Sequence, residues 1–326
     1  MRAAMCREYG GPEVVVMEDI DPPELTMGCV RVRVAAAAVN FPDVLVVADQ
    51  YQISSPTPFV PGSEFAGTIT EVADGVDGFA VGDRVFGSVM VGAFAEEVVA
   101  PAAVLTKIPA GVDEVTAAGF GVAHRTAYHS LRSVAAIQPG AELIVLGAGG
   151  GVGLAAVQLG AVLGATVTAV ASSAEKLEAA RSVGATRLIN YRDGDLRDQL
   201  KAQVTGGADV VIDPVGGELS EAALRRLRAG GRFITVGFAS GTIPRIPLNL
   251  VLLKDISIKG FEFMSFMGNH TEEMLRNEAE LLDLLASGKA NPHVEQTFGL
   301  EDSVAALRHV GDGKAIGKVI VAIGSR

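Results

Sequence analysis

Residues 143–176 read LIVLGAGGGVGLAAVQLGAVLGATVTAVASSAEK, and this stretch decides the fold. An apolar run at 143–146 leads into a glycine-rich turn at 147–153, and small and apolar residues continue to a second apolar run at 166–170. That order predicts a strand, a tight turn, a helix and a parallel strand. In such a unit the glycines let a pyrophosphate approach the backbone at the positive end of the helix.

The turn does not meet the strict G-x-G-x-x-G pattern, because Ala148 stands where the first glycine of a match ending at Gly153 would be. Its place between a buried strand and a helix favours a dinucleotide site. The alternative is that the glycines serve only helix–sheet packing. The residues expected to contact the cofactor here are Gly147, Ala148, Gly150, Gly151, Val152 and Gly153.

The same stretch is also long enough to span a bilayer, because no charged residue occurs between Glu142 and Glu175. Seven glycines interrupt it, however, and four of them fall within 147–151, where a lipid-facing backbone would lack partners. Parallel strands covered on both faces also read as unbroken apolar runs. We therefore favour a buried strand, turn and helix, and expect no membrane partner.

The alternation of strand and helix continues towards the C-terminus, which predicts an α/β fold with a doubly wound parallel sheet over residues 123–262. Residues 1–122 read as short strands and turns, and the elements after 262 have no βαβ rhythm. We expect residues 1–122 and 263–326 to form one discontinuous catalytic domain. The expected later elements are strands at 188–190, 209–213, 232–236, 256–260 and 318–323, and helices at 174–183, 196–204, 219–227, 271–286 and 302–309.

Charge and cysteine content restrict the class of protein. The net charge of −11 argues against a nucleic-acid partner, because phosphate binding needs clustered Lys and Arg. The only cysteines, Cys6 and Cys29, can form neither a disulfide framework nor a metal motif. A reducing cytoplasm is the expected location.

The end of the second strand predicts which dinucleotide is bound. Ser172, Ser173 and then Lys176 stand where an NAD site places an acid for the ribose 2′-OH. Hydroxyls and an ammonium would stabilise a 2′-phosphate, which a carboxylate would repel. The expected cofactor is therefore NADPH. The alternative is that a serine only caps the next helix and that Lys176 is a solvated charge.

The chain carries further motifs outside this stretch: VNFPDVLVVADQYQ (39–52), FVPGSEFAGTITEV (59–72), VGDRVFG (81–87), GAFAEEVVAP (92–101), TAYHSL (126–131), ARSVGATRLINYRD (180–193) and DVVIDPVGG (209–217). Together with the glycine turn, this set resembles the medium-chain dehydrogenase/reductase superfamily, in its quinone oxidoreductase (zeta-crystallin-like) branch. The resemblance covers essentially the whole chain. It implies a GroES-like β-barrel domain and a Rossmann domain, an active site between them, and a homodimer formed through the edge strand 256–260.

The resemblance also implies a site without zinc. Zinc-dependent relatives carry a Cys just before the segment matching Pro42-Asp43, and a His-Glu pair where this chain has Ser63 and Glu64. Here the Cys position is Asn40 or Phe41. A catalytic zinc needs about three protein ligands, which Glu64 alone cannot supply. The four-Cys lobe of a structural zinc is missing too.

The reaction implied is hydride transfer from NADPH to a small acceptor, a quinone or enone, which needs positioning and a hydrogen bond to the developing oxyanion. By resemblance, Asn40 orients the nicotinamide or ribose, Tyr51 donates to the acceptor, Asp43 shares their segment, and Thr126 lies beside the nicotinamide. The alternatives are a structural Tyr51, turn capping by Asn40 and Asp43, and a helix cap at Thr126.

Further cofactor contacts come from the same resemblance. Tyr191 matches a residue near the adenosine phosphate, Lys318 matches one near the cleft, and strands four and five end on the cofactor side at Val215, Gly237 and Phe238. The alternatives are a core or surface position for Tyr191, a plain turn at Gly237 and a surface charge at Lys318. The pair His124-Arg125 departs from the family, and it either lines the cleft or faces solvent.

Three functions are compatible with these features. The first is an NADPH:quinone oxidoreductase. The second is an enone, alkenal or enoyl-thioester reductase. The third is an NADPH-binding structural or RNA-binding protein, which the acidic charge disfavours as an RNA binder.

Overall fold

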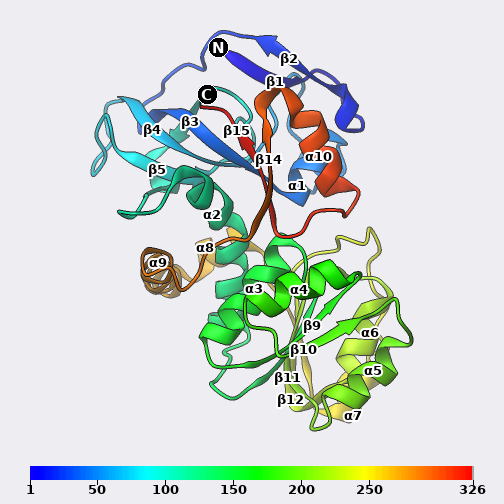
Figure 1. Cartoon of the computed structure of the whole chain (residues 1–326). Coiled ribbons are helices and arrows are strands. Elements are labelled where there is room, and N and C mark those ends of the chain that lie inside the picture. The colour runs from blue at the N-terminus through cyan, green and yellow to red at the C-terminus, as the bar shows by residue number, and fades with distance from the viewer. Residues whose placement is uncertain (325–326) are drawn as a thin grey trace. The chain divides into compact units, whose positions relative to one another are not determined.

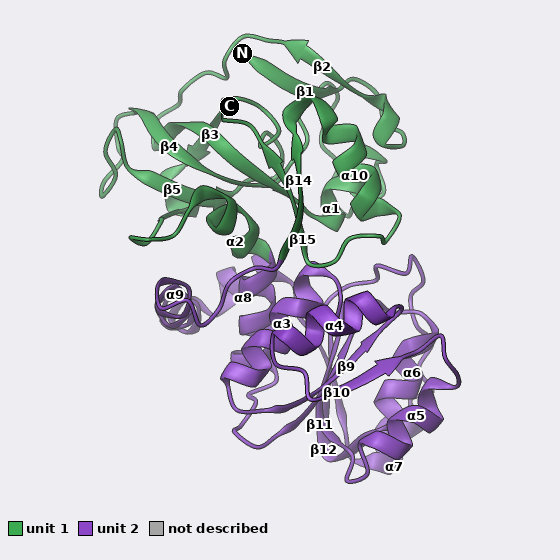
Figure 2. Ribbon diagram, in the orientation of Figure 1, with its two compact units in different colours: residues 1–122, 294–326 green, residues 123–293 purple. Residues whose placement is uncertain are grey.

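The computed structural model describes residues 1–324 and divides the chain into two compact units (Figure 2). The first unit comprises Met1–Val122 and Val294–Arg326, and the second comprises Ala123–His293. The first boundary coincides with the expected one. The second does not, because residues 263–293 belong to the second unit and not to the first.

The second unit is built on one parallel sheet of six strands in the order β10-β9-β8-β11-β12-β13 (Figure 1). The order reverses at β8, where the chain crosses from one half of the sheet to the other, so the predicted doubly wound fold is confirmed. The strands are β8 (Glu142–Leu146), β9 (Thr166–Ala171), β10 (Arg187–Asn190), β11 (Ala208–Asp213), β12 (Leu227–Thr235) and β13 (Ser257–Gly260).

Helices pack on this sheet through their apolar side chains. The apolar core includes Leu200 and Leu224 of two helices against Ile144 and Val211 of the sheet, and all four are fully buried. The stretch 142–175, which alone could suggest a membrane span, folds into β8, the glycine turn, α3 and β9. Within residues 1–324 no helix is long and apolar enough to cross a bilayer. The connecting helices are α3 (Gly151–Val162), α4 (Ala174–Ser182), α5 (Leu196–Gln203), α6 (Glu218–Arg225) and α7 (Asn249–Lys254).

Two helices keep residues 263–293 with the second unit. They are α8 (Phe263–Asn269) and α9 (Thr271–Ala286), the second of which has the expected bounds. In α9, Glu278 accepts a 2.9 Å hydrogen bond from Arg125 Nε, and Asn277 Nδ2 lies 3.0 Å from His129 Nδ1. Arg125 and His129 belong to the end of helix α2 (Glu114–His129), which continues into a π-helical turn, Ser130–Val134. These side-chain contacts, and not sequence rhythm, decide where α9 belongs.

The first unit is built on a seven-stranded sheet in the order β14-β15-β3-β4-β5-β7, with β6 paired to β3. The C-terminal strand β15 pairs antiparallel with β3, so the last residues of the chain complete a sheet that begins near its start. Helices α1 (Phe41–Val47) and α10 (Ser303–Gly311) pack together beside it. The strands are β3 (Cys29–Val39), β4 (Glu64–Val72), β5 (Arg84–Ser88), β6 (Glu97–Pro101), β7 (Leu105–Lys107), β14 (Val294–Gly299) and β15 (Lys318–Ala322), and a separate pair is formed by β1 (Arg2–Cys6) and β2 (Val15–Asp19).

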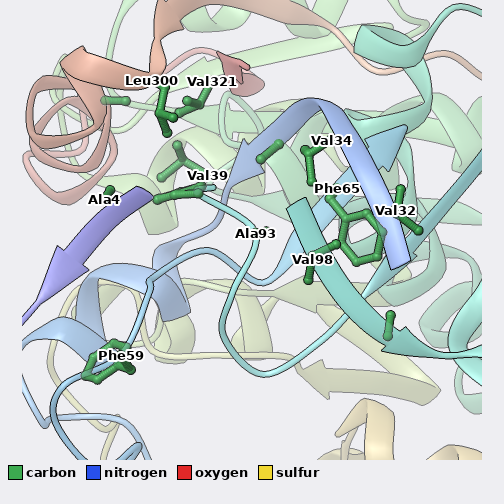
Figure 3. Close-up of a cluster of buried hydrophobic side chains, with 14 of the residues drawn as sticks. Ala4, Val32, Val34, Val39, Phe59, Phe65, Ala93, Val98, Leu300 and Val321 are labelled. Atoms are coloured by element: carbon green, nitrogen blue, oxygen red, sulfur yellow. The ribbon is translucent and has the colours of Figure 1, made fainter. Parts of the chain in front are cut away.

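Alternation along β3 forms much of the core of this unit. Val30, Val32 and Val34 are buried, whereas Arg31 and Arg33 between them are partly or fully exposed. Figure 3 shows Val32 and Val34 beside Phe65 and Val98 from the neighbouring strands. Alternating apolar and basic residues at 30–34 predict a half-buried strand, which is confirmed, and the strand is longer than the alternation alone indicates.

Candidate functional site

The glycine turn between β8 and α3 is as tight as its composition predicts. Gly147 has a φ of +59°, a left-handed conformation that side chains rarely adopt, and a Cβ there would lie 2.5 Å from Val215 Cγ2. A Cβ on Gly153 would overlap the carbonyl oxygen of Gly147. Glycine at both positions lets α3 begin directly against the end of β8.

The start of α3 presents backbone donors at this turn. Gly150 is the N-cap, and the N–H groups of Gly151, Val152 and Gly153 fall in the first turn, where an α-helix supplies no acceptor of its own. Buried Ala148 instead donates its N–H to Val170 at the end of β9 (3.0 Å). The expected turn residues thus lie together in an arrangement that fits a pyrophosphate.

Lys176 packs directly on this turn, a contact that the sequence did not predict. A Cβ built on Gly149 would lie 2.5 Å from both Cβ and Cγ of Lys176, so the lysine stem occupies the space that a side chain at 149 would need. Lys176 is in the first turn of α4. Its aliphatic stem is therefore held beside the glycine turn, and Gly149 joins the candidate site residues.

Ser173 caps α4, as the alternative interpretation proposed. Its Oγ accepts a hydrogen bond from the Lys176 backbone N–H (3.3 Å). The pKa of the exposed Glu175 carboxyl is held below its ordinary value by hydrogen bonds from the backbone of Glu175 and from the Ser173 hydroxyl. Capping employs the oxygen of Ser173, and its hydroxyl hydrogen is directed to the Glu175 carboxylate. Ser172, immediately before it, is partly exposed at the end of β9.

The other expected cofactor residues of the second unit follow the carboxyl ends of neighbouring strands. Tyr191 comes directly after β10 and donates its N–H to Ala171 (3.1 Å), which places it beside the strand end that carries Ser172. A Cβ on Gly216 would lie 2.9 Å from the Phe238 ring, so the turns after β11 and β12 are in contact. Val215 and Gly237 are partly exposed, and 41% of Phe238 is exposed.

Buried Asp213 at the end of β11 organises the turn that carries Val215. Its Oδ1 accepts from the backbone N–H groups of Val215 and Gly216, each at 2.8 Å, and its Oδ2 accepts from Ser220 Oγ at 2.6 Å. Because a buried carboxylate needs such partners, this turn is fixed before any ligand arrives.

Three polar side chains meet in the interior of the first unit. Lys318, at the start of β15, donates from Nζ to Asn40 Oδ1 (2.6 Å) and to Glu64 Oε2 (3.0 Å). Asn40 donates from Nδ2 to the same Glu64 oxygen (3.1 Å). All three are buried, which excludes the interpretation of Lys318 as a surface charge. In the sequence, Glu64 is recognisable only as the match to a zinc ligand of zinc-dependent relatives.

Asp43 is buried beside these residues. One of its oxygens accepts the backbone N–H of Asn40 (2.7 Å), so the capping interpretation holds for this carboxyl. Burial raises the pKa of Asp43 to about 6, although the Ser63 hydroxyl, the Asn40 N–H and the Lys318 charge each favour the ionised form.

Tyr51 and Thr126 are each partly exposed. Tyr51 follows α1 in a loop and packs against the apolar core of the first unit. Thr126 lies inside α2, three residues before its last one, so it is not a helix cap.

The preceding residues His124 and Arg125 are buried and do not face solvent: His124 Nε2 lies 3.1 Å from Gln158 Oε1, and Arg125 pairs with Glu278. Burial alone would raise the pKa of Glu278, but His129 and Arg125 outweigh it and hold that pKa below its ordinary value.

Comparison with known proteins assigns the family. Residues 26–110 match the family described as alcohol dehydrogenase GroES-like domain, and residues 151–283 match that described as zinc-binding dehydrogenase. A quinone oxidoreductase-like protein 2 homolog of Nematostella vectensis is 37% identical over 325 residues, 98% of this chain and 88% of that protein. The chain belongs to the medium-chain dehydrogenase/reductase superfamily, in its quinone oxidoreductase-like branch.

Two further known proteins are similar to this chain. The quinone oxidoreductase of Escherichia coli, solved in complex with NADPH, superposes with a TM-score of 0.90 at 28% identity, over 99% of this chain and 100% of that one. A 2-haloacrylate reductase of a Burkholderia species is 32% identical over 333 residues, 98% of each chain. The predicted GroES-like and Rossmann architecture is confirmed. The protein is a relative of quinone oxidoreductases, and structural relatives bind NADPH.

The side chains present do not fit the zinc ion that the family description mentions. Both oxygens of Glu64 are engaged, Oε1 by the backbone N–H of Val122 (2.6 Å) and Oε2 by Lys318 and Asn40. An ammonium 3.0 Å from that carboxylate would repel a cation. Within residues 1–324, no group of three or more His, Cys, Asp or Glu side chains is arranged to hold a metal ion.

Proposed function

We propose that the protein is an NADPH-dependent oxidoreductase that passes reducing equivalents to a quinone or a similar conjugated carbonyl without a metal. The observation that carries this proposal is the packing of Lys176 on Gly149. It holds a cationic side chain against the phosphate-binding turn, next to Ser172 and Ser173. A 2′-phosphate would find an ammonium and hydroxyls there, which supports NADPH over NADH.

In this proposal the second unit binds the phosphates and the adenosine. The N–H groups at the start of α3 donate to the pyrophosphate, and the positive end of the helix stabilises its charge. Ser172, Ser173, Lys176 and Tyr191 surround the 2′-phosphate. The turns that carry Val215, Gly237 and Phe238 complete the contacts.

Bound NADPH would supply the hydride, and residues of the first unit and of α2 would position the reacting groups. Asn40 orients the nicotinamide or its ribose, and Thr126 contacts the same half of the cofactor. Tyr51 donates a hydrogen bond to the acceptor oxygen as negative charge develops on it. Positioning and one such donor suffice for quinones and enones, because these acceptors already accommodate negative charge.

Titration of the purified protein with NADPH and NADH tests the proposal. NADPH is expected to bind at least ~10-fold more tightly, a difference of about 1.4 kcal/mol. Lys176→Met should remove most of that difference, whereas Lys201→Met, at an exposed lysine of α5, should leave it unchanged. Equal affinities for the two cofactors in the unmodified protein would refute the NADPH assignment.

A second candidate function is reduction of an electron-poor alkene, favoured by the similarity to a 2-haloacrylate reductase. The same residues would serve it, because hydride addition to a conjugated alkene also develops charge on the carbonyl oxygen. NADPH oxidation measured with quinones, enals, enoyl thioesters and 2-haloacrylates distinguishes the two. The quinone proposal requires the highest kcat/KM with a quinone.

We also propose a homodimer formed through β13. This strand is the edge of the parallel sheet, and three of its four residues are exposed. Its free backbone groups could pair with the same strand of a second copy. The exposed leucines 252 and 253 of the preceding helix α7 add apolar surface near this edge.

The free thiols of Cys6 and Cys29 agree with the proposed cytoplasmic location.

A further inference from the structure

The hydrogen bonds among Asn40, Glu64 and Lys318 form a closed triangle between three separate segments of the first unit. Asn40 is the residue before α1, Glu64 begins β4 and Lys318 begins β15. Each pair of side chains is joined by a hydrogen bond of 2.6 to 3.1 Å. The position of each side chain is therefore determined by the other two.

This triangle fixes which way the Asn40 amide faces. An ammonium can only donate, so the atom that Lys318 approaches must be the amide oxygen. An ionised carboxylate can only accept, so the atom that faces Glu64 must be the amide nitrogen. Rotating the amide by half a turn would put donor against donor and acceptor against acceptor. Burial makes that mismatch costly, because water cannot enter to relieve it.

A buried ion pair is by itself poor support for stability, since desolvation offsets much of the attraction. The Lys318 and Glu64 side chains are 4% and 1% exposed, so both charges have lost nearly all of their hydration. The ion pair does, however, fix the orientation of the Asn40 amide group. Its Nδ2 carries a second hydrogen, whose direction is fixed with it.

Glu64 also acts on α2. Its Oε1 accepts the backbone N–H of Val122 at 2.6 Å, in the middle of the helix. A side chain that bonds a mid-helix N–H competes with the regular i→i−4 ladder and sets the local course of the helix. Val122 is one turn before Thr126, the other residue proposed to contact the nicotinamide half of the cofactor. The Glu64 carboxylate therefore contacts both the Asn40 side chain and the α2 backbone one turn before Thr126.

We propose that Lys318 and Glu64 are positioning residues for the nicotinamide half of the cofactor, acting through the amide of Asn40 and not by touching the cofactor themselves. The inference rests on the proposed NADPH binding. It reassigns Lys318, which by resemblance was expected to be a direct cofactor contact. Its ammonium is turned to Asn40 and Glu64 within the unit.

Binding of two ligands separates this role from a purely structural one. The probes are NADPH and adenosine 2′,5′-bisphosphate, which contains the adenosine and the 2′-phosphate but no nicotinamide. The Glu64→Gln/Lys318→Met double variant removes both buried charges together, so that neither is left unpaired. It should weaken NADPH about 10-fold, the value of about one hydrogen bond, and leave the bisphosphate Kd unchanged.

A triple variant that adds Asn40→Ala tests whether the pair acts through Asn40. Asn40→Ala alone should weaken NADPH by a similar factor, and the triple variant should bind no more weakly than the double variant, because the amide has already lost its orientation. Lys318→Arg should retain most of the affinity. Lys107→Met, at an exposed lysine of the same unit that pairs with Asp83, is the matched control and should have no effect.

The outcomes separate the two proposals. If the unmodified protein fails to bind the bisphosphate, the proposed NADPH function is wrong. If it binds both ligands but the double variant binds NADPH as the unmodified protein does, or if the effects of Asn40→Ala and the double variant add, the positioning role is wrong. Should the double variant not fold, Glu64→Gln alone, which keeps the shape of the side chain, should still lower NADPH affinity selectively.

Discussion

The stem of Lys176 lies over the backbone of Gly149, in the space that a β-carbon at that position would take. This contact joins the first turn of α4 to the glycine turn after β8. Gly149 does not have a positive φ, so the conformation of the turn does not itself require glycine there. Glycine is needed at 149 because the Lys176 side chain fills the space of a β-carbon. The same contact places the one basic side chain of the SSAEK segment beside the expected phosphates.

Gly149→Ala should therefore lower NADPH affinity more than NADH affinity. The added methyl group would lie 2.5 Å from Cβ and Cγ of Lys176, too close for contact, so the lysine must move. We expect the preference for NADPH to fall by about 10-fold, the value of one charge-assisted hydrogen bond. Cofactor titration checks this. Gly206→Ala, where a Cβ would meet nothing within 4 Å, is the control. An unchanged ratio of NADPH to NADH affinity in Gly149→Ala would show that Lys176 does not bind the 2′-phosphate.

Lys318→Met should destabilise the protein more than the Glu64→Gln/Lys318→Met double variant does. The single change leaves the Glu64 carboxylate buried without its cation, which costs about 3–5 kcal/mol in comparable sites. The double change leaves no charge behind, so its cost should be smaller. The free energy of unfolding, measured in urea near pH 7, checks this order. The reverse order would mean that the pair is not as desolvated as its burial indicates.

Purified protein should contain well under one zinc per chain. The reason is the donor set at Glu64, where an ammonium and an amide stand in place of further ligands. Elemental analysis of protein grown with added zinc is the measurement. A stoichiometric zinc that a chelator removes together with activity would overturn the metal-free proposal.

The parts of the fold that the sequence predicted well depend on local signals. The helix expected between the glycine turn and the second apolar run is observed at Gly151–Val162, because glycines mark both of its ends and the flanking strands are unbroken apolar runs. The serine and lysine after β9 were also recognisable, since their place follows from that strand end. Short-range patterns therefore predicted the parallel sheet and the tight glycine turn between β8 and α3.

The parts that the sequence did not predict depend on contacts between distant residues. Arg125 and Glu278, 153 positions apart, keep α9 with the second unit, and no periodicity in α9 indicates that partner. Lys318 and Glu64 are 254 positions apart, so nothing near Glu64 showed that a cation would neutralise it. The requirement for glycine at 149 was missed for the same reason, because it arises from packing against another helix.

A charged residue at the sheet edge should prevent the proposed dimer. Ile258 in β13 is 38% exposed, and Ile258→Lys would place an ammonium opposite its own copy across a two-fold axis. The mass in solution, from light scattering during gel filtration, should then fall from two chains to one. Leu275→Lys, at a residue of α9 that is 68% exposed, is the control and should remain dimeric. The edge-pairing proposal fails if both variants keep the mass of the unmodified protein.

The buried carboxyl of Asp43 should make stability fall as the pH rises from 4 to 6. Burial raises its pKa to about 6 in the folded protein, against about 3.9 in an unfolded chain. Near pH 3 the carboxyl is largely protonated in both states and has little effect on folding. Between pH 4 and 6 the unfolded state is ionised to a greater extent than the folded state, so unfolding becomes steadily easier, by about 2 kcal/mol in all.

Asp43→Asn keeps the shape and cannot ionise, so from pH 4 to pH 7 it should gain about 2 kcal/mol relative to the unmodified protein. Urea unfolding at both pH values measures this, with Asp49→Asn, at an exposed aspartate, as the control. Parallel pH curves for Asp43→Asn and the unmodified protein would show that the carboxyl ionises as easily inside the fold as in the unfolded chain, and that Lys318 and the Ser63 hydroxyl compensate for its burial.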